Sequence, residues 1–185
     1  MPDEKEMIIV NYLTTKEDFV DFRLAASKAV INHKEVLILN VLGYVMILFG
    51  LVGEVLLSKA LYTDIIYGLL VLFGLFISFY FNTLQPYFLR SRSINYFESH
   101  GERMIAQIVT FYPEKLELTT DRYKATLPYK MLYQCYEDDK VFILYTGIGE
   151  MRFIPKRAVS QEDCCRIHQI LSEQLKEKYK QEGAR

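Results

Sequence analysis

Two long apolar runs, separated by seven residues, constrain this chain of 185 residues more than any other feature. Val36–Leu57 contains 22 residues with one ionisable side chain, Glu54, and Ile65–Leu84 contains 20 residues with none. A bilayer hydrocarbon core of about 30 Å is crossed by about 20 helical residues, so each run is long enough. Buried helices of soluble proteins rarely run this long without charge. The sequence therefore predicts a transmembrane helical hairpin at 36–84, with spans at 36–57 and 65–84.

The basic residues around the two runs predict the orientation of the hairpin. Short hairpins place both chain ends on the same side of a membrane, and lysine and arginine are enriched on the cytoplasmic side. The connecting loop carries only Lys59, whereas six basic residues flank the runs. We therefore expect a multi-pass protein with both termini in the cytoplasm. The flanking basic residues are Arg23, Lys28, Lys34, Arg90, Arg92 and Arg103.

Two polar residues inside the first run have a structural and a functional interpretation. Asn40 lies about one turn from the cytoplasmic boundary, where it can bond to the other helix or to water. Glu54 lies about one turn from the outer boundary and can reach headgroup water or Lys59. The alternative makes Glu54 and Asn40 an intramembrane polar site of an oligomeric transporter or channel. The structural interpretation is favoured, because the second run carries no partner charge.

The segment before the hairpin, 1–35, predicts a strand followed by a juxtamembrane helix. Met7–Leu13 is rich in β-branched and aromatic residues, as strands are. From Thr15 the apolar residues recur every three or four positions, and Thr15 with Asp18 resembles a capping box. We expect this helix to continue almost unbroken into the first span. Because an isolated strand must pair, we expect Met7–Leu13 to join the sheet formed after residue 103.

Beyond the second run, the sequence predicts a linker helix at 85–102 and a domain at 103–185. Apolar residues there alternate with a period of two, and tight turns separate short segments. Ser160 caps a final helix with an apolar stripe at Ile167, Leu171 and Leu175. This pattern predicts an α+β membrane protein whose cytosolic domain is a pleckstrin-homology-like (PH-like) antiparallel sheet or partial barrel of six or seven strands, capped by the C-terminal helix. The predicted strands are Met104–Tyr112, Lys115–Thr120, Tyr123–Leu127, Leu132–Glu137, Val141–Tyr145 and Met151–Ile154.

The chain lacks the residue patterns of common enzymes and metal sites. Its three cysteines show no CxxC spacing, its three histidines are scattered, and no GxSxG, GxxxxGK[ST] or GxGxxG motif occurs. We therefore expect no catalytic residues, no metal and no cofactor. Asp138 and Asp139 are expected to be solvated turn residues. The net charge of -1 gives no basic surface for nucleic acid.

Four basic residues are candidate contacts for lipid or for a partner. Arg90 and Arg92 follow the second span and could touch anionic headgroups, at about 1 kcal/mol each. Lys156 and Arg157 follow Pro155 and could bind lipid phosphate or a partner's carboxylates. The favoured alternative for Lys156 and Arg157 is a connection whose charges are solvated or paired within the domain.

Several segments resemble the YcxB-like family of bacterial membrane proteins. Tyr12–Phe19, placed before two membrane helices, is similar to the start of family members, and Val141–Tyr145 with Phe153–Val159 is similar to the end of their C-terminal domain. The family usually has a tryptophan where this chain has Tyr129. The resemblance implies a bacterial inner-membrane location and a PH-like cytosolic domain. It brings no known catalytic activity or ligand.

These observations together predict a function class rather than a specific activity. We expect a non-enzymatic inner-membrane protein whose PH-like domain binds or regulates a protein, peptide or lipid partner at the cytoplasmic face. The expected partners are the lipid bilayer and this cytoplasmic partner. Association of the chain with copies of itself is also compatible with the sequence. The alternative is a subunit of an oligomeric transporter or channel.

Overall fold

The computed structural model describes residues 7–31, 33–57, 60–100, 106–120, 123–147 and 149–182, apart from the side chains of His33 and Asn82. The chain is an α+β protein that divides into two compact units. The hairpin unit is Val30–Arg92, and the strand unit combines Met1–Ala29 with Ser93–Arg185.

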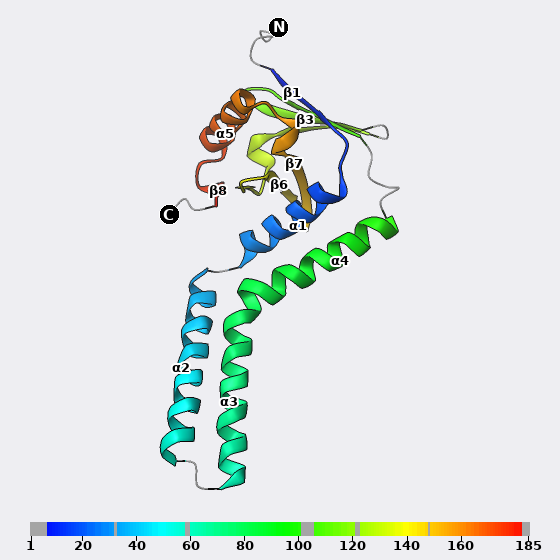
Figure 1. Ribbon diagram of the computed structural model, residues 1–185. Helices are drawn as coiled ribbons and strands as arrows, with labels where there is room; N and C mark the ends of the chain where they lie inside the picture. Colours follow the sequence, from blue (N-terminus) through cyan, green and yellow to red (C-terminus); the bar gives the residue numbers. More distant parts are fainter. Residues whose placement is uncertain are drawn as a thin grey trace. The chain divides into compact units, whose positions relative to one another are not determined.

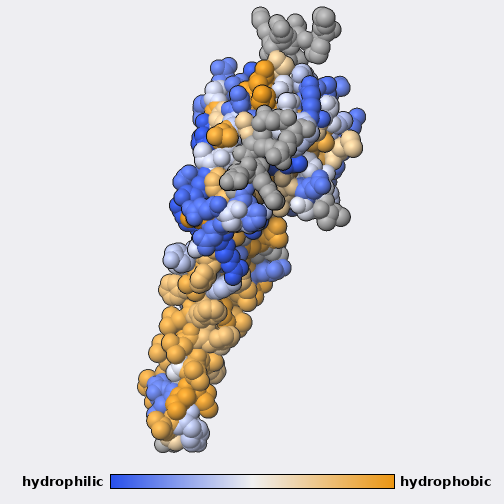
Figure 2. Space-filling model, turned by 90° about the vertical axis from the view of Figure 1, so that its right-hand side faces the viewer, coloured by the Kyte–Doolittle hydropathy of each residue, from blue (hydrophilic) through white to orange (hydrophobic). Residues whose placement is uncertain are grey.

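The hairpin unit contains the two apolar helices α2 (His33–Leu57) and α3 (Leu61–Phe79) (Figure 1). Both are long and apolar enough to cross a membrane, over Lys34–Leu57 and Leu61–Phe79. Only 17% and 11% of their apolar windows are buried, so neither has the burial of a core helix in a soluble domain. Figure 2 shows that apolar side chains cover most of the visible surface of the hairpin, with hydrophilic groups near its tip.

The second apolar helix begins earlier than the sequence predicted, at Leu61 rather than Ile65. The cause is a cap formed at Ala60, whose backbone N–H donates to Thr63 Oγ1 at 3.2 Å. Thr63 in turn donates its own N–H to the Ala60 carbonyl at 2.9 Å. These bonds satisfy groups that a helix start leaves free. The predicted loop therefore loses its last residues to α3, while Ser58 and Lys59 lie outside the described residues.

Glycines let α2 and α3 approach each other closely. A Cβ atom at Gly74 would lie 2.6 Å from the carbonyl oxygen of Gly43, and a Cβ at Gly43 would lie 2.9 Å from the carbonyl oxygen of Gly74. A Cβ at Gly50 would lie 2.6 Å from a methyl group of Val71. No larger residue fits these positions without moving the helices. Close backbone approach through small residues is how helices associate in membranes, where apolar burial supplies no driving force.

The second span predicted at 65–84 is not one regular helix. A π-helical turn, η2 (Tyr80–Leu84), joins α3 to α4 (Gln85–His100). The Gln85 N–H donates to the carbonyl of Tyr80, five residues back. Pro86 has no N–H, and in a regular α-helix its ring would meet the carbonyl four residues earlier. The wider turn is a physical response to that proline, and it lets the helix continue as the predicted linker helix.

The strand before the hairpin joins the strands after it, as predicted. β1 (Ile8–Tyr12) pairs antiparallel with β2 (Gln107–Phe111), with Val10 opposite Val109. β3 (Lys115–Thr120) and β4 (Lys124–Pro128) complete a four-stranded antiparallel sheet in the order β1-β2-β3-β4. The whole hairpin unit is therefore inserted, along the sequence, between two neighbouring strands of one sheet.

The remaining strands form a second sheet, in the order β7-β6-β5-β8. They are β5 (Gln134–Glu137), β6 (Val141–Gly147), β7 (Glu150–Pro155) and β8 (Tyr179–Gln181). The sequence predicted one curved sheet of six or seven strands. The described strands instead make two four-stranded sheets, and no ladder closes them into a barrel. β8, which the sequence did not predict, pairs parallel with β5.

Two helices of the strand unit begin as predicted and end differently. α1 (Lys16–Val30) starts at the cap formed by Thr15 and Asp18, but it ends at Val30, before α2 starts at His33. Residues 31 and 32 therefore separate α1 from α2, where the sequence predicted an almost unbroken passage into the first span. α5 (Gln161–Leu175) starts at Ser160, whose hydroxyl accepts the N–H of Asp163. The sequence favoured a longer helix, because the lysines at 176, 178 and 180 suit a helix C-terminus, but α5 ends at Leu175 and the chain turns to form β8.

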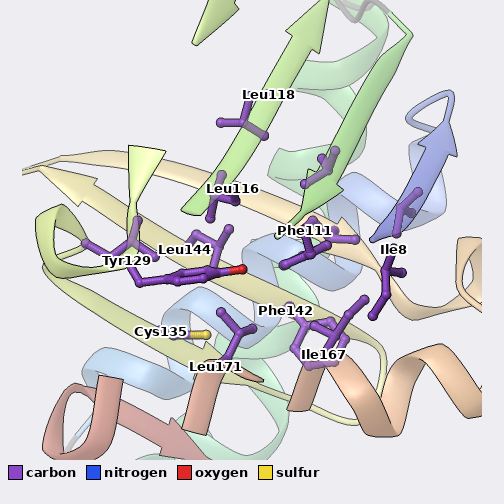
Figure 3. Packing of buried hydrophobic residues seen from close by; sticks show 14 of the residues in the cluster. Ile8, Phe111, Leu116, Leu118, Tyr129, Cys135, Phe142, Leu144, Ile167 and Leu171 are labelled. Carbon is purple, nitrogen blue, oxygen red and sulfur yellow. The ribbon is translucent and has the colours of Figure 1, made fainter. Parts of the chain in front are cut away.

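The core of the strand unit lies between the sheets and α5 (Figure 3). Phe111 and Leu116 come from the first sheet, Phe142 from the second and Leu171 from α5, and all are fully buried. Tyr129, on the short 3-10 helix η4 (Tyr129–Met131), is also buried, and its hydroxyl donates to the carbonyl of Tyr112 at 2.8 Å. Tyr129 is thus a core residue.

A second apolar cluster joins α1 to the opposite face of the second sheet. Phe22 of α1 stacks on Phe153 of β7, with ring centroids 4.6 Å apart. Phe19 and Ala25 of α1 are also buried there, with Ile143 of β6. The segment before the hairpin therefore supplies both a strand and a helix to the strand unit.

Candidate functional site

Arg157 does not project freely from the connection after β7, because it pairs with Asp18 of α1. It lies on the 3-10 helix η5 (Lys156–Ala158). Its Nε donates to Asp18 Oδ1 at 2.5 Å, a second guanidinium nitrogen donates to Asp18 Oδ2, and that nitrogen also reaches the carbonyl of Leu13 at 3.1 Å. This is the bidentate geometry for which arginine is suited.

Asp18 is the buried member of this pair, with 4% of its surface exposed. Burial alone would raise the pKa of its carboxyl, but hydrogen bonds from Arg157 and from Thr15 outweigh burial and lower the pKa. The Thr15 N–H lies 2.8 Å from Asp18 Oδ2, at the start of α1 where a negative charge is favourable. Asp18 is therefore held as a carboxylate, and the pair fastens the start of α1 to the end of β7.

Lys156 also pairs within the strand unit, with Glu137 at the end of β5. Its ammonium lies 2.6 Å from Glu137 Oε1 and 4.8 Å from the centre of the Phe142 ring. Glu137 is 5% exposed and takes further contacts on Oε2, from His168 Nδ1 at 2.7 Å and from the hydroxyl of Tyr179. Three side chains, from η5, α5 and the strand β8, thus converge on one buried carboxylate.

The geometry around Glu137 is that of a structural polar cluster. Its carboxylate has a hydrogen-bonding partner on each oxygen, and Tyr179 and His168 also contact each other at 2.8 Å. Within the described ranges, no group of three or more histidine, cysteine, aspartate or glutamate residues is arranged to hold a metal ion. Cys164 is half-buried on α5, and burial raises the pKa of its thiol, which disfavours the reactive thiolate.

A second polar cluster lies beside the first, at Asp138. The sequence predicted a solvated turn residue, but Asp138 is 7% exposed. Lys28 of α1 donates to Asp138 Oδ2 at 3.2 Å and to Glu182 near the chain end at 2.9 Å. Sequence reasoning missed both clusters, because residues up to 154 positions apart meet in them. The only local signal was a run of three acidic residues, Glu137–Asp139, which also fits an exposed turn.

The other predicted site residues lie in the hairpin unit and belong to neither cluster. Arg90 and Arg92 are exposed on α4. Glu54 is exposed on α2. The side-chain oxygen of Asn40 is buried and has no hydrogen-bond partner within the described chain, and the same is true of Ser78 on α3.

The strand unit also presents large apolar side chains to solvent. Met131, the last residue of η4, is 69% exposed, and Tyr133, two residues later, is 67% exposed. Leu13 is exposed at the end of β1, and Ile9 lies on the outward side of that strand. These residues, together with the basic side chains above, are the candidates for a partner surface.

Comparisons with known proteins connect the strand unit to one family. Residues 111–164 match the YcxB-like protein family, from the end of β2 to the first turn of α5. Comparisons with curated proteins and with solved structures gave no match. The matched segment contains Tyr129, the Glu137 carboxylate and the basic pair Lys156–Arg157. The resemblance to the YcxB-like family that the sequence indicated is confirmed for residues 111–164.

Proposed function

We propose that this chain is an integral membrane protein that spans the bilayer twice and presents a non-enzymatic, PH-like binding domain at the cytoplasmic face. The strand unit is the binding module, and its partner is a protein, a peptide or a lipid. The inner membrane of a bacterium is its proposed location, on the strength of the family resemblance over 111–164.

One observation carries this proposal: the apolar hairpin is inserted between β1 and β2, which are neighbours in one sheet. Folding of the strand unit therefore requires that both ends of the hairpin return to the same side. The exposed apolar surface of α2 and α3 needs a bilayer, because water would penalise it. A hairpin that only connects two strands of a domain serves as a tether.

The PH-like assignment is supported by strand order. Four antiparallel strands are followed by a further antiparallel group, β5 to β7, and a C-terminal helix then packs against the core between the sheets. This is the order that the sequence led us to expect, apart from the added β8. The proposed PH-like fold favours binding over catalysis. The internal pairing of the polar clusters at Glu137 and Asp138 supports the same choice.

Transport is the weaker alternative. Glu54 and Asn40 lie 14 positions apart on one helix, which corresponds to about 21 Å at about 1.5 Å per residue. They therefore cannot line a common site within one copy. A two-helix hairpin has no interior, so a pathway would need several copies around Glu54.

The binding proposal is tested by capture of a partner from native membranes with the full chain as bait. A fragment of 103–185 is unsuitable, because it lacks β1 and α1. Alanine at Lys156 or Arg157 is also unsuitable as a control, because it would leave Glu137 or Asp18 buried and unpaired. The matched control is residues 30–92 alone, which keep both apolar helices and lack the strand unit.

We expect a protein, peptide or lipid to be enriched with the full chain and not with residues 30–92. The double variant Met131→Ser/Tyr133→Ser, which changes only exposed side chains, reports whether that part of the surface is used. Equal recovery with both baits would contradict the binding proposal. So would turnover of a substrate by the purified chain that is lost when a single polar residue is replaced.

A further inference from the structure

The last described residues form a strap that leaves α5 through a strained turn. We define the C-terminal strap as residues 176–182, which contain the 3-10 helix η6 (Lys176–Lys178) and β8. Lys176 has φ 50° and ψ −115°, and it is the one residue other than glycine with positive φ in the described ranges. A side chain makes this conformation unfavourable, so the contacts of the strap must hold it there.

The strap covers one edge of the second sheet. β8 lies parallel to β5, with Tyr179 opposite Cys135 and Gln181 opposite Glu137. Cys135 is fully buried, so the edge of β5 borders the core directly. The backbone bond from the Glu182 N–H to the Glu137 carbonyl, at 2.8 Å, extends the pairing. Without the strap, β5 would present an open strand edge, which is a template for another extended chain.

The strap is held by polar side chains and by the packing of Tyr179 against the core. No strap residue is fully buried, and Lys180 and Gln181 are exposed. Tyr179 is half-buried, and its hydroxyl donates to Glu137. Lys178 donates to the carbonyl of Leu132 at 3.1 Å. A three-residue parallel strand with such contacts belongs to the least stable parts of a fold, which open without global unfolding.

The end of the strap includes a like-charge contact. Contact with Asp138 raises the pKa of Glu182, and Lys28 offsets the effect only in part. Lys28 bonds to both carboxyl groups, at 3.2 Å to Asp138 and 2.9 Å to Glu182. At the end of the strap, the attraction of Glu182 to Lys28 is therefore opposed by its repulsion from Asp138, so this contact adds little stability.

We propose that the edge of β5 is a binding site for an extended peptide segment, and that the C-terminal strap is its occupant within the chain. The partner segment carries an aromatic hydroxyl that reaches Glu137 and His168. It carries a carboxylate three residues later that reaches Lys28, as Tyr179 and Glu182 do in the strap. This inference deepens the proposed function, because it names the part of the strand unit that binds and the chemistry of its partner.

The strap and the partner compete for one site. The observed affinity for a partner is proportional to the fraction of chains whose strap is open, so weakening the strap must strengthen binding. Tyr179→Phe removes one hydrogen bond to a carboxylate, and Glu137 keeps Lys156 and His168 as partners. A bond of this kind accounts for about a tenfold change in the open population.

The test measures binding of a fluorescent peptide with the sequence of residues 177–182, Glu-Lys-Tyr-Lys-Gln-Glu, to the full chain in detergent. We expect Tyr179→Phe to bind the peptide about tenfold more tightly than the wild type. The matched control, Lys180→Gln, changes an exposed side chain of β8 and should bind like the wild type. A peptide with phenylalanine in place of its tyrosine should bind more weakly to all three chains. Equal affinity of the wild type and Tyr179→Phe would overturn the proposal.

Hydrogen exchange of the same chains tests the strap without any ligand. We expect amides of 179–182 in the wild type to exchange at least tenfold faster than those of β6. Tyr179→Phe should accelerate the exchange of 179–182 further and leave β6 unchanged. Exchange of the strap at the rate of β6 would overturn the proposal. Neither measurement depends on membrane location, so a failure here is distinguishable from a failure of the proposed anchoring.

Discussion

The pair Arg157–Asp18 shows how a basic residue that looks like a binding contact becomes part of the fold. Arg157 is half exposed, at 53% of its side chain, whereas the carboxyl group that it binds is almost completely buried. Arg157 stabilises the fold because it neutralises Asp18, whose carboxylate would otherwise be buried in the strand unit without a counter-charge. The sequence offered internal pairing as the favoured alternative, and the structure supplies the partner.

Replacement of Arg157 therefore destabilises the strand unit. We predict that Arg157→Gln lowers the free energy of unfolding by about 2 kcal/mol, because a buried carboxylate loses charged hydrogen bonds. The figure lies below the largest losses for buried pairs, since water screens the exposed guanidinium. Thermal unfolding followed by near-ultraviolet circular dichroism of the tyrosines measures it. The control is Arg23→Gln, an exposed arginine on α1, which should change the free energy by less than about 0.5 kcal/mol.

The same pair predicts a pH dependence. The pKa of Asp18 is lowered in the folded chain, so its contribution to stability is present above the ordinary aspartate pKa of about 3.9 and is lost as pH falls through the folded value. The stability difference between the wild type and Arg157→Gln should thus be largest near neutral pH and shrink below about pH 4. The raised pKa of Glu182 is shared by both chains and cancels in the difference. A difference that stays constant down to about pH 2 would contradict this assignment.

At the scale of elements, the hairpin depends on glycines that face the neighbouring helix. We predict that Gly43→Leu destabilises the α2–α3 pair by about 1–3 kcal/mol, because the new side chain meets the backbone of Gly74. Gly68→Leu is the matched control, since a Cβ there has no atom within 4 Å. Unfolding of the purified chain by sodium dodecyl sulfate, followed by helical circular dichroism, compares them. Equal effects of the two leucines would show that the helices do not pack through Gly43.

Much of the element order could be predicted, because its signals are local. The apolar runs predicted α2 and α3, the alternation from 115 to 120 predicted β3 with its bounds, and Ser160 predicted the start of α5. That β1 joins the later strands followed from a physical rule, since a lone strand of β-branched residues needs a neighbour, but the rule did not identify β2 as that neighbour. Helix ends were less predictable. The break after Val30 has no proline or glycine to announce it.

The parts that could not be predicted depend on contacts between distant residues. β8 lies in the lysine-rich segment Lys176–Lys180, whose charges fit the end of a helix, and only the edge of β5 makes it a strand. The division into two sheets is set by packing around α5 and not by strand spacing. Of the predicted site residues, Lys156 and Arg157 came with no local sign of their partners, because Glu137 and Asp18 lie 19 and 139 positions away.

At the scale of the whole molecule, the chain is a domain with an apolar hairpin inserted near its start. Every strand of the first sheet except β1 follows the hairpin, so the sheet cannot be completed until the hairpin has turned back. We infer that the proposed membrane insertion and completion of the strand unit are coupled in synthesis. Because both connections to the hairpin lead into the same sheet, they would determine the side of the membrane on which the domain folds.

The most direct test of the proposed two-span anchor is cysteine labelling from one side of the membrane. The natural Cys165 is exposed on α5. In a second chain, Cys164→Ser and Cys165→Ser remove the thiols of α5, and Leu61→Cys places a thiol at the start of α3, where Leu61 is 77% exposed. In bacterial spheroplasts, a membrane-impermeant maleimide should label Leu61→Cys at once. It should label Cys165 only after the membrane is permeabilised. Labelling of Cys165 on intact spheroplasts would contradict a cytoplasmic domain held by a two-span hairpin.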